Sequence, residues 1–284
     1  MPFNTILVHI DDSPYLARRV DVAAALAPPG GHLIGAAATG VSRFLYHSMP
    51  PEQDDPTLAL HLDMLREQAR TALASFSQRC GELGVASFEE RIVDDDTAAG
   101  ISLHARAADL VVVGQAEPDG KPANAEIPTA VITHAGRPVL VVPWAGGLAG
   151  AGQHILVSWD GGREAARAMQ LALPLLKAAR SVSIAVFEMP ATAHTAADAL
   201  AADPRPWLAR HGIEAELSVH AVEHHMRLSR RHEVGERLLS LATERGHDML
   251  VMGAHGHSRL RESLLGGVTR TVLASMTVPV LMAH

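Results

Sequence analysis

The chain carries the same series of sequence elements twice, at an interval of roughly 140 to 150 residues, which is the mark of a duplicated domain. The apolar run from Thr5 to Asp11 ends in an acid, and the run from His154 to Asp160 has the same form. Further along, the stretch from Ala108 to Gly114 is matched by the stretch from His247 to Gly253. An Ala-rich amphipathic segment follows the first run in each half. The sequence therefore predicts two tandem copies of one domain.

Strand-like and helix-like segments alternate in both halves, and this alternation predicts an α/β fold: a parallel sheet covered by helices on both faces. In the first half, strands are expected near 4–10, 32–38, 86–92, 109–114 and 138–143, and helices near 14–27, 56–83, 97–107 and 125–135. In the second half, strands are expected near 154–159, 181–187, 214–221, 248–253 and 278–283, and helices near 162–178, 196–211, 233–245 and 266–276.

The domain boundaries follow from a composition shift in the middle of the 284-residue chain. Residues 145–153 consist mainly of Gly and Ala, a composition typical of a linker. The predicted organisation is a degenerate domain over 1–144, a linker over 145–153, and a domain with a glycine-rich loop over 154–284.

Composition excludes several classes of protein. The formal net charge is −7 and the basic residues form no long run, which argues against a dedicated nucleic-acid binder. The single cysteine, Cys80, excludes an internal disulfide and fits a reducing compartment. Residues 1–10 lack the pattern of a secretory signal, and apolar stretches are interrupted before about 18 residues, so no membrane span is expected. The expected location is the cytoplasm.

The chemically most informative motif follows the fourth strand of the second half. Gly253, Gly256, Gly266 and Gly267 form the pattern Gly-x2-Gly-x9-Gly-Gly. Gly253 ends a strand at the carboxyl edge of the sheet, where open α/β sheets bind ligands. Gly266 and Gly267 open a helix, whose free N–H groups and dipole favour an anion. The motif is consistent with a phosphate-binding loop, and equally with glycines that only make tight turns.

The acid after the first strand, the motif from Val251 to Gly266 and the closing Pro-Val-Leu strand together resemble the universal stress protein family in its tandem form. The resemblance implies two Rossmann-like domains of the adenine nucleotide alpha hydrolase type. Each would have five parallel strands ordered 3-2-1-4-5. It also implies ATP bound where strands one and four part. Carried onto this chain, the implied nucleotide-binding residues are Asp160, Val186, Met252, Gly253, Gly256, Gly266, Gly267 and Val268.

The motif departs from the family pattern at its end, where Gly267 replaces the usual Ser or Thr. The missing hydroxyl removes one hydrogen bond to a phosphate, which would weaken affinity roughly 10- to 100-fold. Thr269 is a candidate substitute, and Ser158, His255 and His257 are candidate additional contacts. The resemblance leaves open a Mg²⁺ ion that accompanies the nucleotide.

The first half departs further. Glu117 stands where the second glycine of the motif is expected, and no Gly pair follows near Ala125 to Pro128. A carboxylate at this position would repel a phosphate. We therefore expect a mainly structural role for the first half, although Asp11 is retained.

Other chemistry-bearing residues are given structural interpretations. His220, His224, His225 and His232 are predicted to lie at a strand end and in an exposed polar loop, beside arginines that would repel a metal ion. Gly256-His257-Ser258 resembles a nucleophile elbow only faintly, because its second glycine is missing. Cys80 is interpreted as a half-buried helix residue, and residues 41–55 as a loop-like insert that is either a solvated connection or a partner surface. No catalytic residue and no metal site is predicted.

The predicted function is that of a stress-response protein that binds an adenine nucleotide in its second half and acts through regulated interaction, with at most slow ATP hydrolysis. One alternative is a partner-binding protein that has lost the nucleotide in both halves. A second is an adenylyl-transferring enzyme, which the sequence from Asp160 to Arg163 disfavours because it lacks a histidine pair. The closing strands near 138–143 and 278–283 are expected to pair the two domains, and a homodimer is plausible. The protein partner is unknown.

Overall fold

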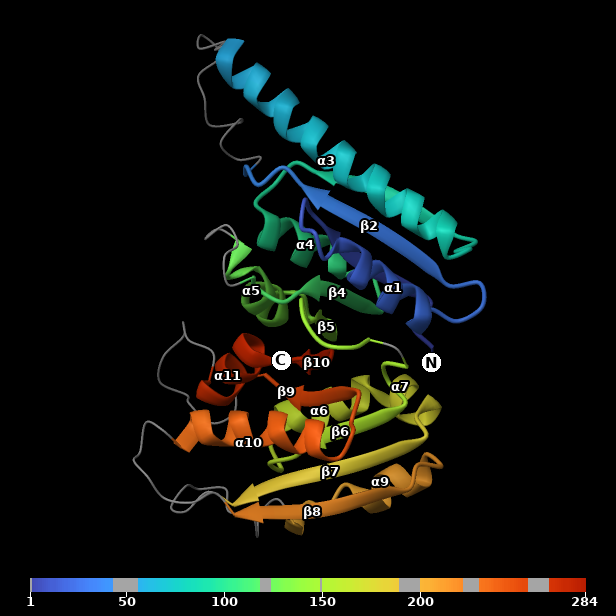
Figure 1. The fold of residues 1–284 in the computed structure, drawn as a ribbon, viewed down its shortest axis with the longest axis vertical. Coiled ribbons are helices and arrows are strands. Elements are labelled where there is room, and N and C mark those ends of the chain that lie inside the picture. The colour runs from blue at the N-terminus through green and yellow to red at the C-terminus, as the bar shows by residue number, and fades with distance from the viewer. Residues whose placement is uncertain are drawn as a thin grey trace. The chain divides into compact units, whose positions relative to one another are not determined.

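The computed structural model describes residues 2–42, 56–117, 124–148, 150–188, 200–221, 230–254 and 266–284. These residues form two compact units, Pro2–Val139 and Leu140–His284. The division falls inside strand β5 (Val139–Val142), slightly before the domain end that the sequence suggests at residue 144. Figure 1 labels the elements of both units.

The first unit is built on parallel strands in the order β3-β2-β1-β4. These strands are β1 (Thr5–Ile10), β2 (His32–Ala38), β3 (Phe88–Val93) and β4 (Leu110–Gly114). The start of β5 lies beside β4, where the Val111 N–H donates to the Pro138 carbonyl at 3.1 Å. The predicted order 3-2-1-4-5 is therefore confirmed. The central strands read as continuous apolar runs because helices cover both of their faces.

The helices of the first unit form two layers. α1 (Leu16–Leu26) and α3 (Pro56–Glu82) pack together on one face of the sheet, and α4 (Thr97–Ala105) and α5 (Ile127–His134) pack together on the other. Asp96 caps α4 by accepting the Ala99 N–H at 3.0 Å, as residues of this type do at helix N-termini. Figure 1 shows α3 along β2, with its first turns extending past the carboxyl end of that strand.

The second unit repeats this topology with parallel strands in the order β8-β7-β6-β9-β10, which is again 3-2-1-4-5. The strands are β6 (His154–Ser158), β7 (Ser181–Glu188), β8 (Ala215–Ala221), β9 (Met249–Gly253) and β10 (Val280–Ala283). The helices are α6 (Arg163–Leu171), α7 (Leu173–Ala178), α9 (Arg205–Arg210), α10 (Arg230–Glu244) and α11 (Gly267–Ser275).

Two helix predictions for the second half need correction. The helix expected over 162–178 is two helices, because Pro174 at the start of α7 lacks the N–H that a continuous helix requires. The helix expected over 196–211 is interrupted at 202–204, where Asp203 precedes Pro204, and α9 begins only at Arg205. In both places proline limits the helix, although the apolar periodicity continues.

The Gly- and Ala-rich segment that was predicted to be a linker is held to the second unit at two glycines. Gly146 has φ +86°, and a Cβ there would lie 2.1 Å from the carbonyl oxygen of Thr277. Gly152 has φ +90° and donates its N–H to Asp248 Oδ1 at 2.9 Å. The described part of the segment therefore has fixed contacts without regular secondary structure.

Within the described ranges, no helix combines the length and the apolar character that crossing a membrane requires.

Candidate functional site

The strand registers of the second unit gather the predicted site residues at one edge of the sheet. Ser158 ends β6 opposite Ala185 of β7, directly before Val186, and Gly253 ends the neighbouring β9. After β6 the chain continues to β7 on one side of this strand pair, whereas after β9 it continues to β10 on the other side. The direction in which successive strands are added therefore reverses between β6 and β9. Ligands of open α/β sheets bind at such a switch point, outside the carboxyl ends of the strands.

Asp160 lies just beyond the end of β6 and is exposed. Its Oδ1 accepts the N–H of Gly162 at 2.8 Å, which forms a turn that leads into α6. A Cβ on Gly162 would lie 2.9 Å from that same oxygen, so a side chain at this position would displace the Asp160 carboxylate. Asp160 therefore has a structural role in the turn, and its exposed carboxylate is at the same time positioned at the switch point.

Val186 and Met252 are buried, with 1% and 4% of their surface exposed. Neither side chain is therefore placed to meet a ligand, and a backbone contact at Val186 stays a prediction of the resemblance. Gly253 is tightly enclosed: a Cβ on it would lie 2.6 Å from both Ala165 N and Glu164 C at the start of α6. This glycine of the motif is thus explained first by the packing of a helix backbone against the end of β9.

The predicted phosphate-binding glycines Gly266 and Gly267 lie at the N-terminus of α11. Gly266 is the N-cap with φ −56° and ψ 152° and makes no side-chain cap. The first backbone hydrogen bond of the helix joins Arg270 N–H to the Gly266 carbonyl, so the N–H groups of Gly267, Val268 and Thr269 lack intrahelical acceptors. Thr269 itself is only 2% exposed, so we do not assign its hydroxyl the role of the missing one.

Helix α10 supports the first turn of α11. The Thr271 hydroxyl lies 3.0 Å from the Gly267 carbonyl, to which it donates, and 2.7 Å from His232 Nδ1. Since the hydroxyl hydrogen is used on the carbonyl, His232 Nδ1 is the donor of the second bond. Gly235 permits this packing, because a Cβ there would lie 2.7 Å from the Cβ of Thr271.

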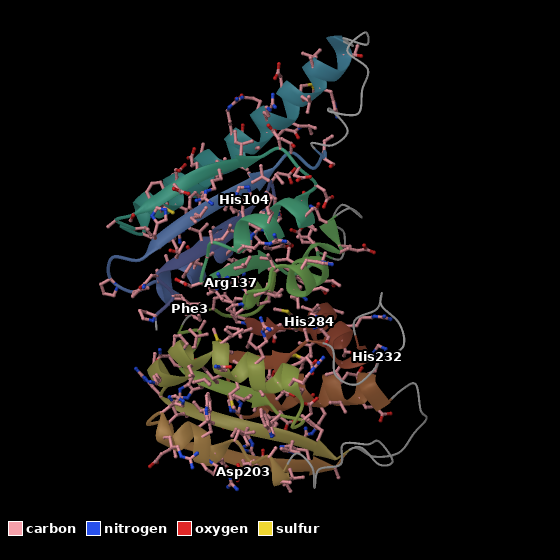
Figure 2. The ribbon with its side chains drawn as sticks, turned by 180° about the vertical axis from the view of Figure 1, so that it is seen from behind. Phe3, His104, Arg137, Asp203, His232 and His284 are labelled. Carbon is pink, nitrogen blue, oxygen red and sulfur yellow. The ribbon has the colours of Figure 1, made fainter. Side chains whose placement is uncertain are left out.

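The predicted location of the histidine cluster is wrong for His232, which lies in the first turn of α10 and not in a loop (Figure 2). His220 lies at the end of β8, where its Nε2 is 2.9 Å from Ser218 Oγ and its ring is 5.5 Å from that of Phe187. His224 and His225 lie outside the described residues, as do His255, Gly256, His257 and residues 43–55 of the insert.

The first unit has different side chains at its own switch point, between β1 and β4. Arg19 of α1 is 3% exposed and forms a bidentate ion pair with Asp11, in which Nη1 lies 3.1 Å from Oδ2. The same Nη1 lies 3.4 Å from Nδ1 of the buried His9. The Ser13 hydroxyl donates to Glu117, which joins the loop after β1 to the loop after β4.

The electrostatics of this cluster are strongly perturbed. Burial lowers the pKa of His9 to about 4; the charge of Asp11 opposes this and that of Arg19 adds to it. Burial alone would raise the pKa of Asp11, but the charge and hydrogen bonds of Arg19, with smaller contributions from His9 and Ser13, lower it to about 2. At neutral pH the cluster is therefore a neutral imidazole beside a matched pair of opposite charges.

Sequence reasoning missed Arg19. Its signal was a cation on the apolar face of α1, between the buried Leu16 and Val20. It also missed the function of the aspartates that precede β4 and β9. Asp109 accepts the Thr5 N–H at 2.9 Å, and Asp248 accepts the N–H groups of 152–154 at 2.9 to 3.1 Å, so these acids hold the starts of β1 and β6.

The thiol of Cys80 is a structural group of the core and not a reactive one. Cys80 is fully enclosed in α3, and burial raises the pKa of its thiol to about 11. Across the described ranges, no group of three or more His, Cys, Asp or Glu side chains is arranged to hold a metal ion.

The fold and the carboxyl-edge geometry define a tandem pair of Rossmann-like α/β domains. The model of the universal stress protein family matches residues 152–284, and this segment of the chain belongs to that family. A universal stress protein from Methanocaldococcus jannaschii is 40% identical over 47 residues, which is 16% of this chain and 29% of that protein.

Two solved structures share the fold of the whole chain. A universal stress protein from Archaeoglobus fulgidus DSM 4304 has a TM-score of 0.72 and 15% identity, covering 100% of this chain and 99% of the other. A putative universal stress protein from Pseudomonas aeruginosa UCBPP-PA14 has a TM-score of 0.60 and 17% identity, covering 99% and 93%. The two-domain architecture of the chain is thus shared with members of this family.

Proposed function

We propose that the second unit binds an adenine nucleotide, with ATP as the expected ligand, and that the protein acts in a stress response through regulated interaction. The observation that carries this proposal is the arrangement of the exposed Asp160 and the uncapped N-terminus of α11 in a unit of the universal stress protein family. Asp160 would accept hydrogen bonds from the nucleoside. The N–H groups at 267 and 268 would bind phosphate oxygens.

Binding is expected to be modest because Gly267 provides no hydroxyl and Thr269 is enclosed by protein. The loss of one hydrogen bond to a charged acceptor corresponds to roughly 10- to 100-fold in affinity. A Mg²⁺ ion would enter with the triphosphate. We propose binding without dedicated catalysis.

Titration calorimetry with ATP tests the proposal, using the wild type, Gly256→Glu and Gly81→Glu. Gly256→Glu imitates the residue that the first unit has in this place, Glu117, and is expected to abolish binding by charge repulsion. Gly81→Glu is the matched control, because a side chain at this exposed position of α3 meets no atom within 4 Å. Wild-type protein that takes up no ATP at millimolar concentration would defeat the proposal.

The missing hydroxyl at Gly267 and the enclosure of Thr269 favour a second function, that of a partner-binding module without a nucleotide. Nucleotide that remains bound through purification would exclude this second function.

A further inference from the structure

The two switch points can be aligned residue by residue. Ile6 and Ile155 hold the same register positions in β1 and β6, and Gly114 and Gly253 both end the strand next to them. The buried positions of the following helices also coincide, with Leu16, Arg19 and Val20 in α1 matching Ala165, Ala168 and Met169 in α6. Without any gap, Arg19 is therefore the counterpart of Ala168.

Arg19 reaches from α1 to the ends of both strands that form the switch point. Its Nη1 is 3.1 Å from Asp11 Oδ2, beyond the end of β1, and 3.3 Å from the place where a Cβ on Gly114 would stand at the end of β4. In the second unit, the same position has only the methyl group of Ala168, and Ser158 replaces His9. The first copy thus has a cation at this position, and the second copy has a methyl group in its place.

The contacts of Arg19 use up the polar groups that a nucleoside would need. Both oxygens of Asp11 accept from the guanidinium, whereas the equivalent carboxylate of Asp160 is exposed. Ser13 and Glu117 form a second connection across the same edge. Arg19 Nε is buried without a hydrogen-bond partner in the described part of the chain, a cost that the ion pair with Asp11 offsets.

We propose that the Arg19 side chain occupies the first switch point and excludes a nucleoside from it, which makes Arg19 a specificity-determining residue. The chain therefore takes up one nucleotide and not two, and the unit without a ligand is closed by its own side chain. The inference rests on the proposed function for its stoichiometry, but the occupancy of the first site by Arg19 can be tested without a nucleotide.

The first test compares two substitutions that both remove the ion pair. Arg19→Ala leaves a cavity beside Asp11, and Arg19→Met removes the charge but fills most of the space. Adenosine is the probe, because it lacks the phosphates that Glu117 would repel. Titration calorimetry should give one equivalent of adenosine for the wild type, for R19M and for the exposed control Arg70→Ala, and two equivalents for R19A. A folded R19A that still takes up one equivalent would overturn the proposal.

The second test needs no nucleotide. R19A leaves Asp11 without its counter-ion, so its thermal midpoint should fall by about 10 °C. Guanidinium chloride at millimolar concentration should raise the midpoint of R19A but not that of R19M, with sodium chloride as the ionic-strength control. Equal responses of the two variants would show that no guanidinium site was vacated.

The two tests separate failure of the inference from failure of the proposed function. If the wild type binds no adenosine while guanidinium rescues R19A, Arg19 occupies the site and the proposed function is at fault. If R19A does not fold at the assay temperature, Asp11→Asn/Arg19→Ala replaces it, since this variant has no uncompensated buried charge. The double variant is again expected to bind one more equivalent than the wild type, and an unchanged stoichiometry contradicts the proposal.

Discussion

The switch points of the two units have the same backbone plan and opposite chemical states. In the first unit, the buried Arg19 neutralises the half-buried Asp11, and Glu117 accepts a hydrogen bond from Ser13. In the second unit, Asp160 is exposed and Ala168 leaves its position without a charge. The difference teaches that the shared fold determines where a ligand site can lie, whereas a few side chains decide whether that place is closed or available.

The largest expected effect concerns the two glycines that end β4 and β9. In Gly253→Ala, the new Cβ would lie 2.6 Å from backbone atoms of Glu164 and Ala165, which cannot move independently. In Gly114→Ala, the nearest atom is the end of the Arg19 side chain at 3.3 Å. We expect a loss of about 3 kcal/mol in unfolding free energy for G253A and less than about 1 kcal/mol for G114A. Denaturant unfolding of the two variants measures both.

This pair of variants is its own control, because each introduces the same methyl group at the same place in the fold. Similar losses for both would show that the two helices approach their strands equally closely, and the comparison between the units would fail at this position.

The next effect is a pH dependence that belongs to the first unit. Burial lowers the pKa of His9 from its ordinary value of 6.5 to about 4 in the folded protein, so the unfolded chain binds more protons between these values. Stability is therefore fully present above pH 6.5 and is lost as the pH falls toward 4. Between pH 7 and pH 5 the loss should be about 2 kcal/mol. Asp11, with its pKa of about 2, adds to the loss only at lower pH.

Denaturant unfolding of the wild type and His9→Asn at pH 7 and pH 5 isolates this contribution. The difference between the two pH values should shrink in H9N, while His247, whose pKa is also lowered by burial, continues to contribute in both proteins. His134→Asn, at an exposed position, is the control. An unchanged pH dependence in H9N would mean that His9 is protonated to the same extent in both states.

The smallest effect sharpens the description of the second unit. His232→Ala removes the bond to Thr271 that holds the first turn of α11, and it should weaken ATP binding about threefold, since a partly exposed hydrogen bond contributes less than about 1 kcal/mol. Adenosine binding should not change, because the proposed function places only the phosphates against α11. His211→Ala is the control. An equal loss for adenosine and ATP would assign His232 a general structural effect.

Much of the fold could be predicted from the sequence. The repeated apolar runs gave the strands, and the position of Gly253 at a strand end placed the motif at the carboxyl edge. The helix break before Pro174 and the contacts of Gly146 and Gly152 were not predicted, because apolar periodicity and Gly content do not report which backbone groups find partners. Gly256 and His255 remain predictions, since they lie outside the described residues.

By itself, the sequence determined that the chain contains two copies of one α/β domain, and that Glu117 distinguishes the first from the second. Only the tertiary structure decided the state of each site. Arg19 lies eight positions after Asp11 in a helix, and no spacing rule joins them. A buried cation must be matched by a nearby anion, and the packing of α1 against β1 and β4 determines which anion that is.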